Sequence, residues 1–262
     1  MARIDKLYAV TVCVGRHETL RHCLRNHLVL DDWVIVTTQD DEDTQLACED
    51  AGVRYIVSER FYEGGYYHEL ESETKTSKET VWQDSAVFNK GKAINDGMDT
   101  LPQEGWHIVL DADIILPKNM RSVFKRSVLK PHQLYGMDRV ICPSIDDYKR
   151  VTENGWVGVP LYEGLRGADK ENFMREHHGK CYLHRPKTSG DGYFQMFSGS
   201  KGMRYSESFS SRFADTRGFS QEYWKHTPWH RRKLQNNESG VRTNLTCFHL
   251  GNAFEPWTTT EI

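Results

Sequence analysis

The stretch WHIVLDADIILP, residues 106–117, decides the fold. In it an apolar run leads straight into Asp111, Ala112 and Asp113, and a second short apolar run follows. Continuous Ile, Val and Leu runs of this length are typical of a strand that is buried on both faces, as in a parallel sheet. Two carboxylates at the end of such a strand are costly to bury without a partner, and ligands bind at that end of an open α/β sheet. The stretch therefore predicts that Asp111 and Asp113 hold a divalent cation, which in turn holds a phosphate.

Before this stretch, strand-like and helix-like patterns alternate along the chain. Strands are predicted at 7–14, 33–38 and 53–57, and helices at 18–30 and 44–51. Such alternation is the pattern of a parallel, Rossmann-like sheet flanked by helices.

After residue 57, strand-like and helix-like patterns no longer alternate regularly. A polar loop covers 58–84, and helices are expected at 85–101, 117–129 and 220–225, with strands at 139–142, 192–197 and 244–250. Residues 146–189 are rich in Gly, His and charge and follow no clean period. The sequence therefore predicts one α/β domain in two halves, joined near residue 143, of which the second is less regular.

Composition excludes several classes of protein. With 38% hydrophobic and 27% charged residues the chain has an ordinary globular composition, and its net charge of −3 requires neither nucleic acid nor a membrane as partner. No apolar run approaches the length of a membrane span. Six cysteines without any Cys-x-x-Cys pair favour free thiols in a reducing compartment, so a cytoplasmic location is expected.

Three parts of the sequence carry a resemblance to a known family. FNKGKAINDGM, residues 88–98, followed by the central stretch, resembles the first half of family 2 and related GT-A glycosyltransferases, which carry a helix of the Asn-x-Gly-x-Ala-x-Asn-x-Gly type and then an apolar strand ending in Asp-x-Asp. CFHLGN, residues 247–252, resembles the His-Leu-Gly segment that supplies a third metal ligand in many GT-A enzymes. GDGYFQMF (190–197) and FADTRGFSQEYW (213–224) are similar to acceptor-side segments, whereas 146–189 departs from the pattern.

The resemblance implies a GT-A fold over residues 1–262, with a nucleotide-sugar-binding half at 1–143 and an acceptor-binding half at 144–262. It implies transfer of a hexosyl or pentosyl group from a nucleoside diphosphate sugar, a UDP-sugar foremost, to an acceptor hydroxyl. The acceptor stays open between a glycan and modified DNA.

Chemistry assigns the metal ligands. A departing diphosphate carries several negative charges, and Mg²⁺ or Mn²⁺ bridging the phosphates stabilises them as a Lewis acid. Such cations favour carboxylate oxygens. We expect Asp113 to bind the metal directly, Asp111 to bind the metal or the ribose hydroxyls, and His249 to be the remote ligand. The ordinary alternative for His249 is a core histidine that is bonded to backbone.

The resemblance also implies which residues contact the donor, among them Asp40 and Lys92. Asp40 is equally well explained as part of a solvated acidic cluster, and Lys90 and Lys92 as surface residues. The expected donor contacts are Thr11, Val12, Val14, Arg16, Asp40, Asn89, Lys92, Asp111 and Ala112.

An inverting enzyme needs a general base for the acceptor hydroxyl. Asp215 is the first candidate and Asp191 the reserve. The alternative for Asp215 is a carboxylate at a helix N-terminus. A retaining mechanism stays open.

A different class of function is suggested by residues 201–233. This segment holds eight basic and three acidic residues with interleaved aromatics, which would suit phosphate contacts and base stacking. A nucleic-acid-binding protein is therefore one alternative, and a glycosyltransferase acting on modified DNA combines both ideas. A catalytically silent sugar-nucleotide binder is the third.

Overall fold

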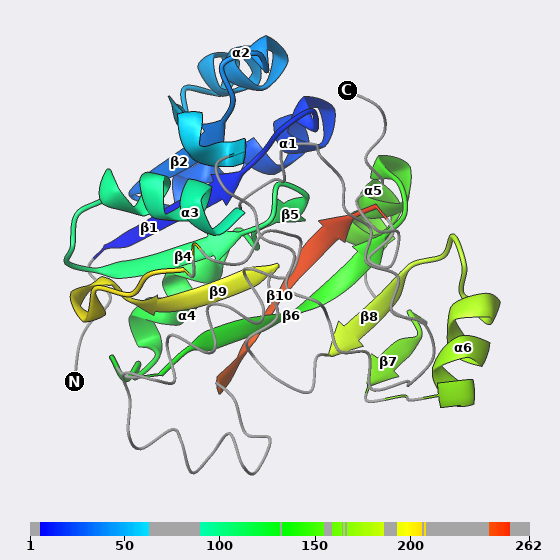
Figure 1. Ribbon diagram of the computed structural model, residues 1–262. Helices are drawn as coiled ribbons and strands as arrows, with labels where there is room; N and C mark the ends of the chain where they lie inside the picture. The colour runs from blue at the N-terminus through cyan, green and yellow to red at the C-terminus, as the bar shows by residue number, and fades with distance from the viewer. Residues whose placement is uncertain are drawn as a thin grey trace, which may run out of the picture.

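The computed structural model describes residues 6–62, 90–131, 133–154, 159–163, 165, 167–185, 193–205, 207 and 241–251. Within them, strands form a mixed sheet with helices on both faces (Figure 1). The strand order is β3-β2-β1-β4-β9-β6-β10-β5, with β8 on β6 and β7 on β8. The predicted α/β class is confirmed.

The first half of the sheet is entirely parallel, as predicted. Its strands pair in the order β3, β2, β1, β4, which is the pattern that βαβ connections produce. Their bounds are β1 Leu7–Val12, β2 Asp32–Thr37, β3 Arg54–Val57 and β4 Trp106–Leu110.

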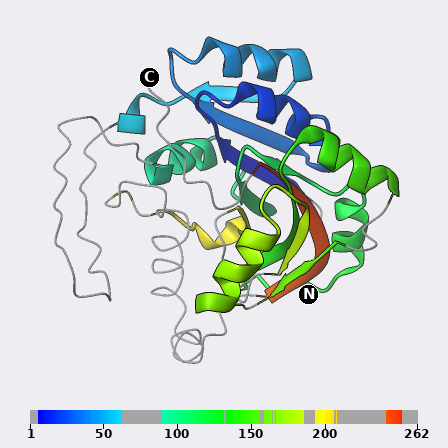
Figure 2. The same cartoon turned by 90° about the vertical axis from the view of Figure 1, so that its right-hand side faces the viewer.

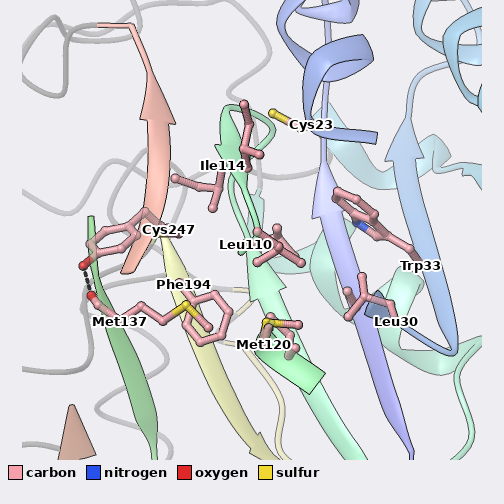
Figure 3. Packing of buried hydrophobic residues seen from close by; sticks show 14 of the residues in the cluster. Cys23, Leu30, Trp33, Leu110, Ile114, Met120, Met137, Phe194 and Cys247 are labelled. Carbon is pink, nitrogen blue, oxygen red and sulfur yellow. Dashed lines mark hydrogen bonds between the residues drawn. The ribbon is translucent and has the colours of Figure 1, made fainter. Parts of the chain in front are cut away.

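These strands are buried on both faces because each face has its own helices. One face is covered by α1 (His17–Leu24), α2 (Glu42–Ala51) and α4 (Met120–Arg126), which contribute buried residues to the larger apolar core. On the other face α3 (Lys90–Asp99) packs against β1 and β2, as Figure 1 shows. Figure 3 shows members of the larger core packed together, including Leu30, Trp33, Leu110, Met120 and Phe194.

Gly97 lets α3 approach the sheet closely. A Cβ added at this glycine would lie 2.6 Å from Val10 Cγ1 and 2.7 Å from Val36 Cγ2, which are shorter than real Cβ contacts. A residue without a side chain is therefore required at the point where the helix crosses β1 and β2.

The second half of the sheet mixes directions. The strand β9 (Phe194–Ser198) runs antiparallel to β4, whereas β6 (Tyr135–Cys142) runs parallel to β10 (Val241–Leu250). The two-residue strand β5 (Ile114–Ile115) runs antiparallel to β10. This last pairing brings the carboxyl end of β10 beside the residues that follow β4.

Residues 146–189, for which the sequence showed no period, contain regular structure where they are described. Helices α5 (Ile145–Asn154) and α6 (Gly167–Glu176) and strands β7 (Leu161–Glu163) and β8 (Tyr182–Arg185) form there. Figure 2 shows α6 on the outside of these strands. Strands β7 and β8 share a small core of Ile141, Tyr162 and Tyr182, with Phe173 of α6 packed against it, whereas Val151 of α5 belongs to the larger core.

Several predicted boundaries were wrong. The helix expected at 18–30 ends at Leu24 and is followed by a 3₁₀ turn, His27–Val29, because the His27 ring contacts the Leu24 carbonyl (2.8 Å). The helix expected at 117–129 is confined to α4, and the strand expected at 139–142 begins four residues earlier in β6. Two further 3₁₀ turns cover Glu59–Tyr62 and Gly199–Lys201. The helix expected at 220–225 lies outside the described residues.

All six cysteines are free and buried, in agreement with the prediction of free thiols. None of the helices in the described parts of the chain is long and apolar enough to cross a membrane. The cytoplasmic location stays a prediction.

Candidate functional site

The aspartate pair lies in the tight connection between β4 and β5. Asp111 N donates to Tyr193 O (3.1 Å), and Ile114 N donates to Asp111 O (3.3 Å). Asp113 O accepts a hydrogen bond from Leu250 N (2.9 Å). Backbone contacts to Tyr193, the residue before β9, and to β10 therefore hold both aspartates at the end of β4, as the sequence predicted.

The pairing of β5 with β10 brings His249 to Asp113, although the two are 136 residues apart. His249 Nε2 lies 3.0 Å from Asp113 Oδ2. The other carboxylate oxygen, Asp113 Oδ1, is buried and has no hydrogen-bond partner in the structure. Burial opposes ionisation of Asp113, but His249, Arg139 and Lys90 together hold its pKa below the usual value. The site thus contains an ionised carboxylate with one oxygen that lacks a partner.

The lysine at this site is Lys90, at the start of α3. Its Nζ lies 2.6 Å from Asp111 Oδ1, and the two side chains are only 12% and 18% exposed. Lys92 was the expected donor contact on this helix, whereas no such contact was expected for Lys90. Successive helical positions are about 100° apart, so the two lysines face nearly opposite directions. Lys92 is half-buried and instead helps to lower the pKa of Glu207.

The carboxylates fit a divalent cation. A buried oxygen without a partner is costly, and Mg²⁺ and Mn²⁺ prefer carboxylate ligands, so Asp113 Oδ1 suits such an ion. His249 fits less well, since its Nδ1 lies 2.9 Å from Arg139 Nη1, a donor. In the part of the chain that the structure describes, no three His, Cys, Asp or Glu residues are arranged as a complete metal site.

A buried cluster around Arg139 extends the site, and sequence reasoning missed it. Arg139 is 9% exposed, its Nε donates to His184 Nδ1 (3.0 Å), and its guanidinium carbon lies 4.0 Å from the centre of the Tyr193 ring. Burial and the neighbouring Arg139 charge lower the pKa of His184 to about 3. His184 is therefore neutral at pH 7.

The residues expected from β1 have different environments. Thr11 is fully buried, and its Oγ1 accepts a hydrogen bond from Trp33 Nε1 (3.0 Å). Val12 and Ala112 are also buried. The structure thus shows the Thr11 hydroxyl bonded inside the sheet, and donor binding by these residues stays a prediction. Two further expected residues lie nearer the surface: Val14, which is half-buried, and Arg16, which is exposed.

Asp40 is exposed beyond the end of β2, and its neighbour Asp41 makes the structural contacts. Asp41 Oδ2 accepts from Gly15 N (2.8 Å) and Thr37 Oγ1 (3.1 Å), and its Oδ1 accepts from Thr44 N (3.2 Å). Asp41 is therefore the N-cap of α2 and also fixes the turn after β1. The helix was predicted to begin at residue 44, and α2 begins two residues earlier, at Glu42, so the acidic residues just ahead of the predicted start were the signal that could have identified this cap.

Asn95, the second asparagine of the helix pattern, is 2% exposed and binds the Tyr205 backbone in both directions. Tyr205 N donates to Asn95 Oδ1 (2.9 Å), and Asn95 Nδ2 donates to Tyr205 O (3.0 Å). This asparagine therefore joins the second half of the chain to α3.

Most of the basic segment 201–233 lies outside the described residues. Two members that are described have other partners. Arg204 forms an ion pair with Asp99, and Tyr205 is buried and donates its hydroxyl proton to Gln195. Tyr205 is therefore not available for stacking on a base, whereas the Arg204 side chain is 48% exposed.

Three of the predicted site residues, Asn89, Asp191 and Asp215, lie outside the described residues. Their roles stay predictions. The described part of the candidate site therefore consists of Asp111, Asp113, His249, Lys90 and the Arg139 cluster.

No protein-family model matches the chain, and no curated protein matches it. Among solved structures, the chain is similar to Mycobacterium tuberculosis glucosyl-3-phosphoglycerate synthase, at 12% identity and a TM-score of 0.49 over 98% of this chain and 74% of that chain. A structure of the same synthase with Mn²⁺, uridine diphosphate and glucosyl-3-phosphoglycerate is similar at 12% identity and a TM-score of 0.47, over 95% of this chain and 72% of that chain. Identity this low and TM-scores below 0.5 assign no activity, so the function has to follow from the chain's own residues.

Proposed function

We propose that this chain is a metal-dependent glycosyltransferase that moves a sugar from a nucleoside diphosphate sugar to an acceptor hydroxyl. The proposal is carried by one observation: Asp113, two residues after Asp111 in the chain, has a buried oxygen without a partner just past the end of the central strand β4. The carboxyl ends of such strands are where nucleotides bind in open α/β sheets. A UDP-sugar is the donor we propose first.

The chain's own groups have separate tasks in this proposal. Asp113 and Asp111 hold a divalent cation, which supplies Lewis-acid stabilisation of the departing diphosphate when it is bound. Lys90 neutralises part of the charge of Asp111. Its ammonium group would lie near the phosphates of the bound donor. Asp215, or Asp191 in reserve, accepts the proton of the acceptor hydroxyl in an inverting reaction.

The structure favours neither of the alternative classes. A nucleic-acid-binding surface would rest on residues 201–233; of its described members, Tyr205 is buried and bonded to Gln195, and the exposed Arg204 is paired with Asp99. We therefore keep the acceptor to a hydroxyl group and leave its carrier to experiment.

A thermal-shift screen of UDP-, GDP- and dTDP-sugars, each with and without Mn²⁺, tests the proposal. We expect one nucleotide class to raise the melting temperature only when Mn²⁺ is present, and the same donor to be hydrolysed slowly to the nucleoside diphosphate. Asp113→Asn should lose both effects. The matched control is Asp146→Asn, which removes the same charge at a side chain that is 85% exposed on α5. Donor binding without turnover by any preparation would favour a silent binder, and no binding would refute the proposal.

A further inference from the structure

Arg139 stands at the centre of a chain of hydrogen bonds that ends at the candidate cation site. From β6 its Nη1 reaches His249 Nδ1 (2.9 Å), and His249 Nε2 reaches Asp113 Oδ2 (3.0 Å). Its Nε reaches His184 Nδ1 (3.0 Å) on the neighbouring strand β8. No carboxylate among the described residues forms an ion pair with this buried guanidinium, so its hydrogen bonds go to two imidazoles.

The direction of these hydrogen bonds follows from the chemistry of arginine. A guanidinium has five N–H donors, no acceptor, and does not lose its proton in proteins. The Nδ1 of His249 must therefore be the acceptor. A neutral imidazole carries its single proton on the other nitrogen, so His249 Nε2 is the donor and Asp113 Oδ2 accepts from it.

This arrangement is the reverse of what a metal-binding histidine usually shows. A ligating imidazole binds the ion through one nitrogen and donates its other N–H to a carboxylate, carbonyl or water. Here the outer nitrogen of His249 faces a donor, and the inner nitrogen, which is the one beside Asp113, carries the proton. Ligation through Nε2 would leave the ring without any proton while it stays beside Arg139.

We propose that Arg139 is a positioning residue which fixes His249 as a hydrogen-bond donor to Asp113. His249 then holds Oδ2 of the carboxylate and leaves Oδ1, the oxygen without a partner, to face the cation. In this account His249 orients a ligand and does not ligate the ion itself. The inference deepens the proposed function and rests on it for the presence of the cation, but the proton position on His249 is independent of any activity.

The first test is the tautomer of His249 in the cation-free protein. Long-range ¹H–¹⁵N correlation spectra of histidine-labelled protein distinguish the two neutral forms, and the signals missing in His249→Gln assign the residue. We expect the wild type to show the form with the proton on Nε2. In Arg139→Met, which removes the donor, we expect a mixture of both forms, whereas Arg139→Lys keeps a charged donor and should restore the wild-type form.

A His249 proton on Nδ1 in the wild type would overturn the proposal, whether or not the Arg139 variants fold. An unchanged Nε2 form in a folded Arg139→Met protein would show that the arginine does not set the tautomer.

The second test asks whether His249 touches the ion. Pulsed EPR of Mn²⁺ bound to the wild type detects a directly coordinated histidine nitrogen. We expect no such nitrogen signal, and a signal that disappears in His249→Gln would overturn the proposal. If Mn²⁺ does not bind the wild type at all, the proposed function fails at this site, while the tautomer measurement still decides the role of Arg139.

Discussion

The contact between Arg139 and His184 makes stability depend on pH in a defined way. His184 is 9% exposed, its Nδ1 accepts a hydrogen bond from Arg139, and its pKa is lowered to about 3 by burial and by that charge. An unfolded histidine has a pKa of about 6.5, so below this value the unfolded chain binds a proton that the folded protein rejects. The stability contributed by neutral His184 is therefore present above about pH 6.5 and is lost progressively as the pH falls towards 3.

The size of the effect follows from the same values. Between pH 7.5 and pH 5, the protonation of this residue in the unfolded chain lowers the free energy of unfolding by about 2 kcal/mol. Urea unfolding followed by circular dichroism at the two pH values measures it. In His184→Asn the amide oxygen can still accept from Arg139, but the titrating group is gone. We expect the wild type to lose about 2 kcal/mol more than this variant between pH 7.5 and pH 5.

His178→Asn, at an exposed histidine, is the matched control and should lose as much stability as the wild type. An equal loss in the wild type and in His184→Asn would refute the argument. It would mean that His184 accepts a proton in the folded protein as readily as in the unfolded chain.

Three further substitutions test other parts of the structure. Asp41→Ala removes an acceptor from three donors, so we expect a loss of about 2 kcal/mol in urea unfolding. Gly97→Ala places a methyl group 2.6 Å and 2.7 Å from valine side chains of β1 and β2, so we expect a destabilisation of about 1–3 kcal/mol in spite of the better helix propensity of alanine. Lys90→Met removes the charge beside Asp111, so the melting temperature should fall in EDTA, and Mn²⁺ should raise it more than in the wild type.

Each of these expectations has a clear contrary result. Unchanged stability of Asp41→Ala would show that water replaces its contacts, and a stabilised Gly97→Ala would show that α3 shifts without cost. If Mn²⁺ raised the melting temperature equally in Lys90→Met and in the wild type, the lysine would have no influence on the cation site.

The parts of the site that the sequence predicted are those set by local patterns. The apolar run of β4 is continuous because helices cover both faces of the sheet, and the aspartates follow it directly. His249 was expected to be a metal ligand together with Asp113, and it lies 3.0 Å from that carboxylate, but its role as a ligand stays a prediction.

The parts that could not be predicted depend on three-dimensional packing. Choosing Lys90 over Lys92 requires the rotational position of α3, which the side chains packed beneath it determine. Arg139 bonds to partners that are 45 and 110 residues away, and no sequence spacing connects them. The elements between 145 and 185 are short, and β7, α6 and β8 pack on a small aromatic core of their own, so their periodicity is too brief to detect.

The central claim is that the carboxylates after β4 hold a divalent cation. A titration of Mn²⁺ followed by EPR, in the presence of UDP, tests it most directly in the wild type, Asp113→Asn and the control Asp146→Asn. We predict that Asp113→Asn weakens Mn²⁺ binding by more than about 10-fold, since even residues that only orient a ligand cost this much, while Asp146→Asn binds as the wild type does. Equal Mn²⁺ affinity in a folded Asp113→Asn protein would contradict the account.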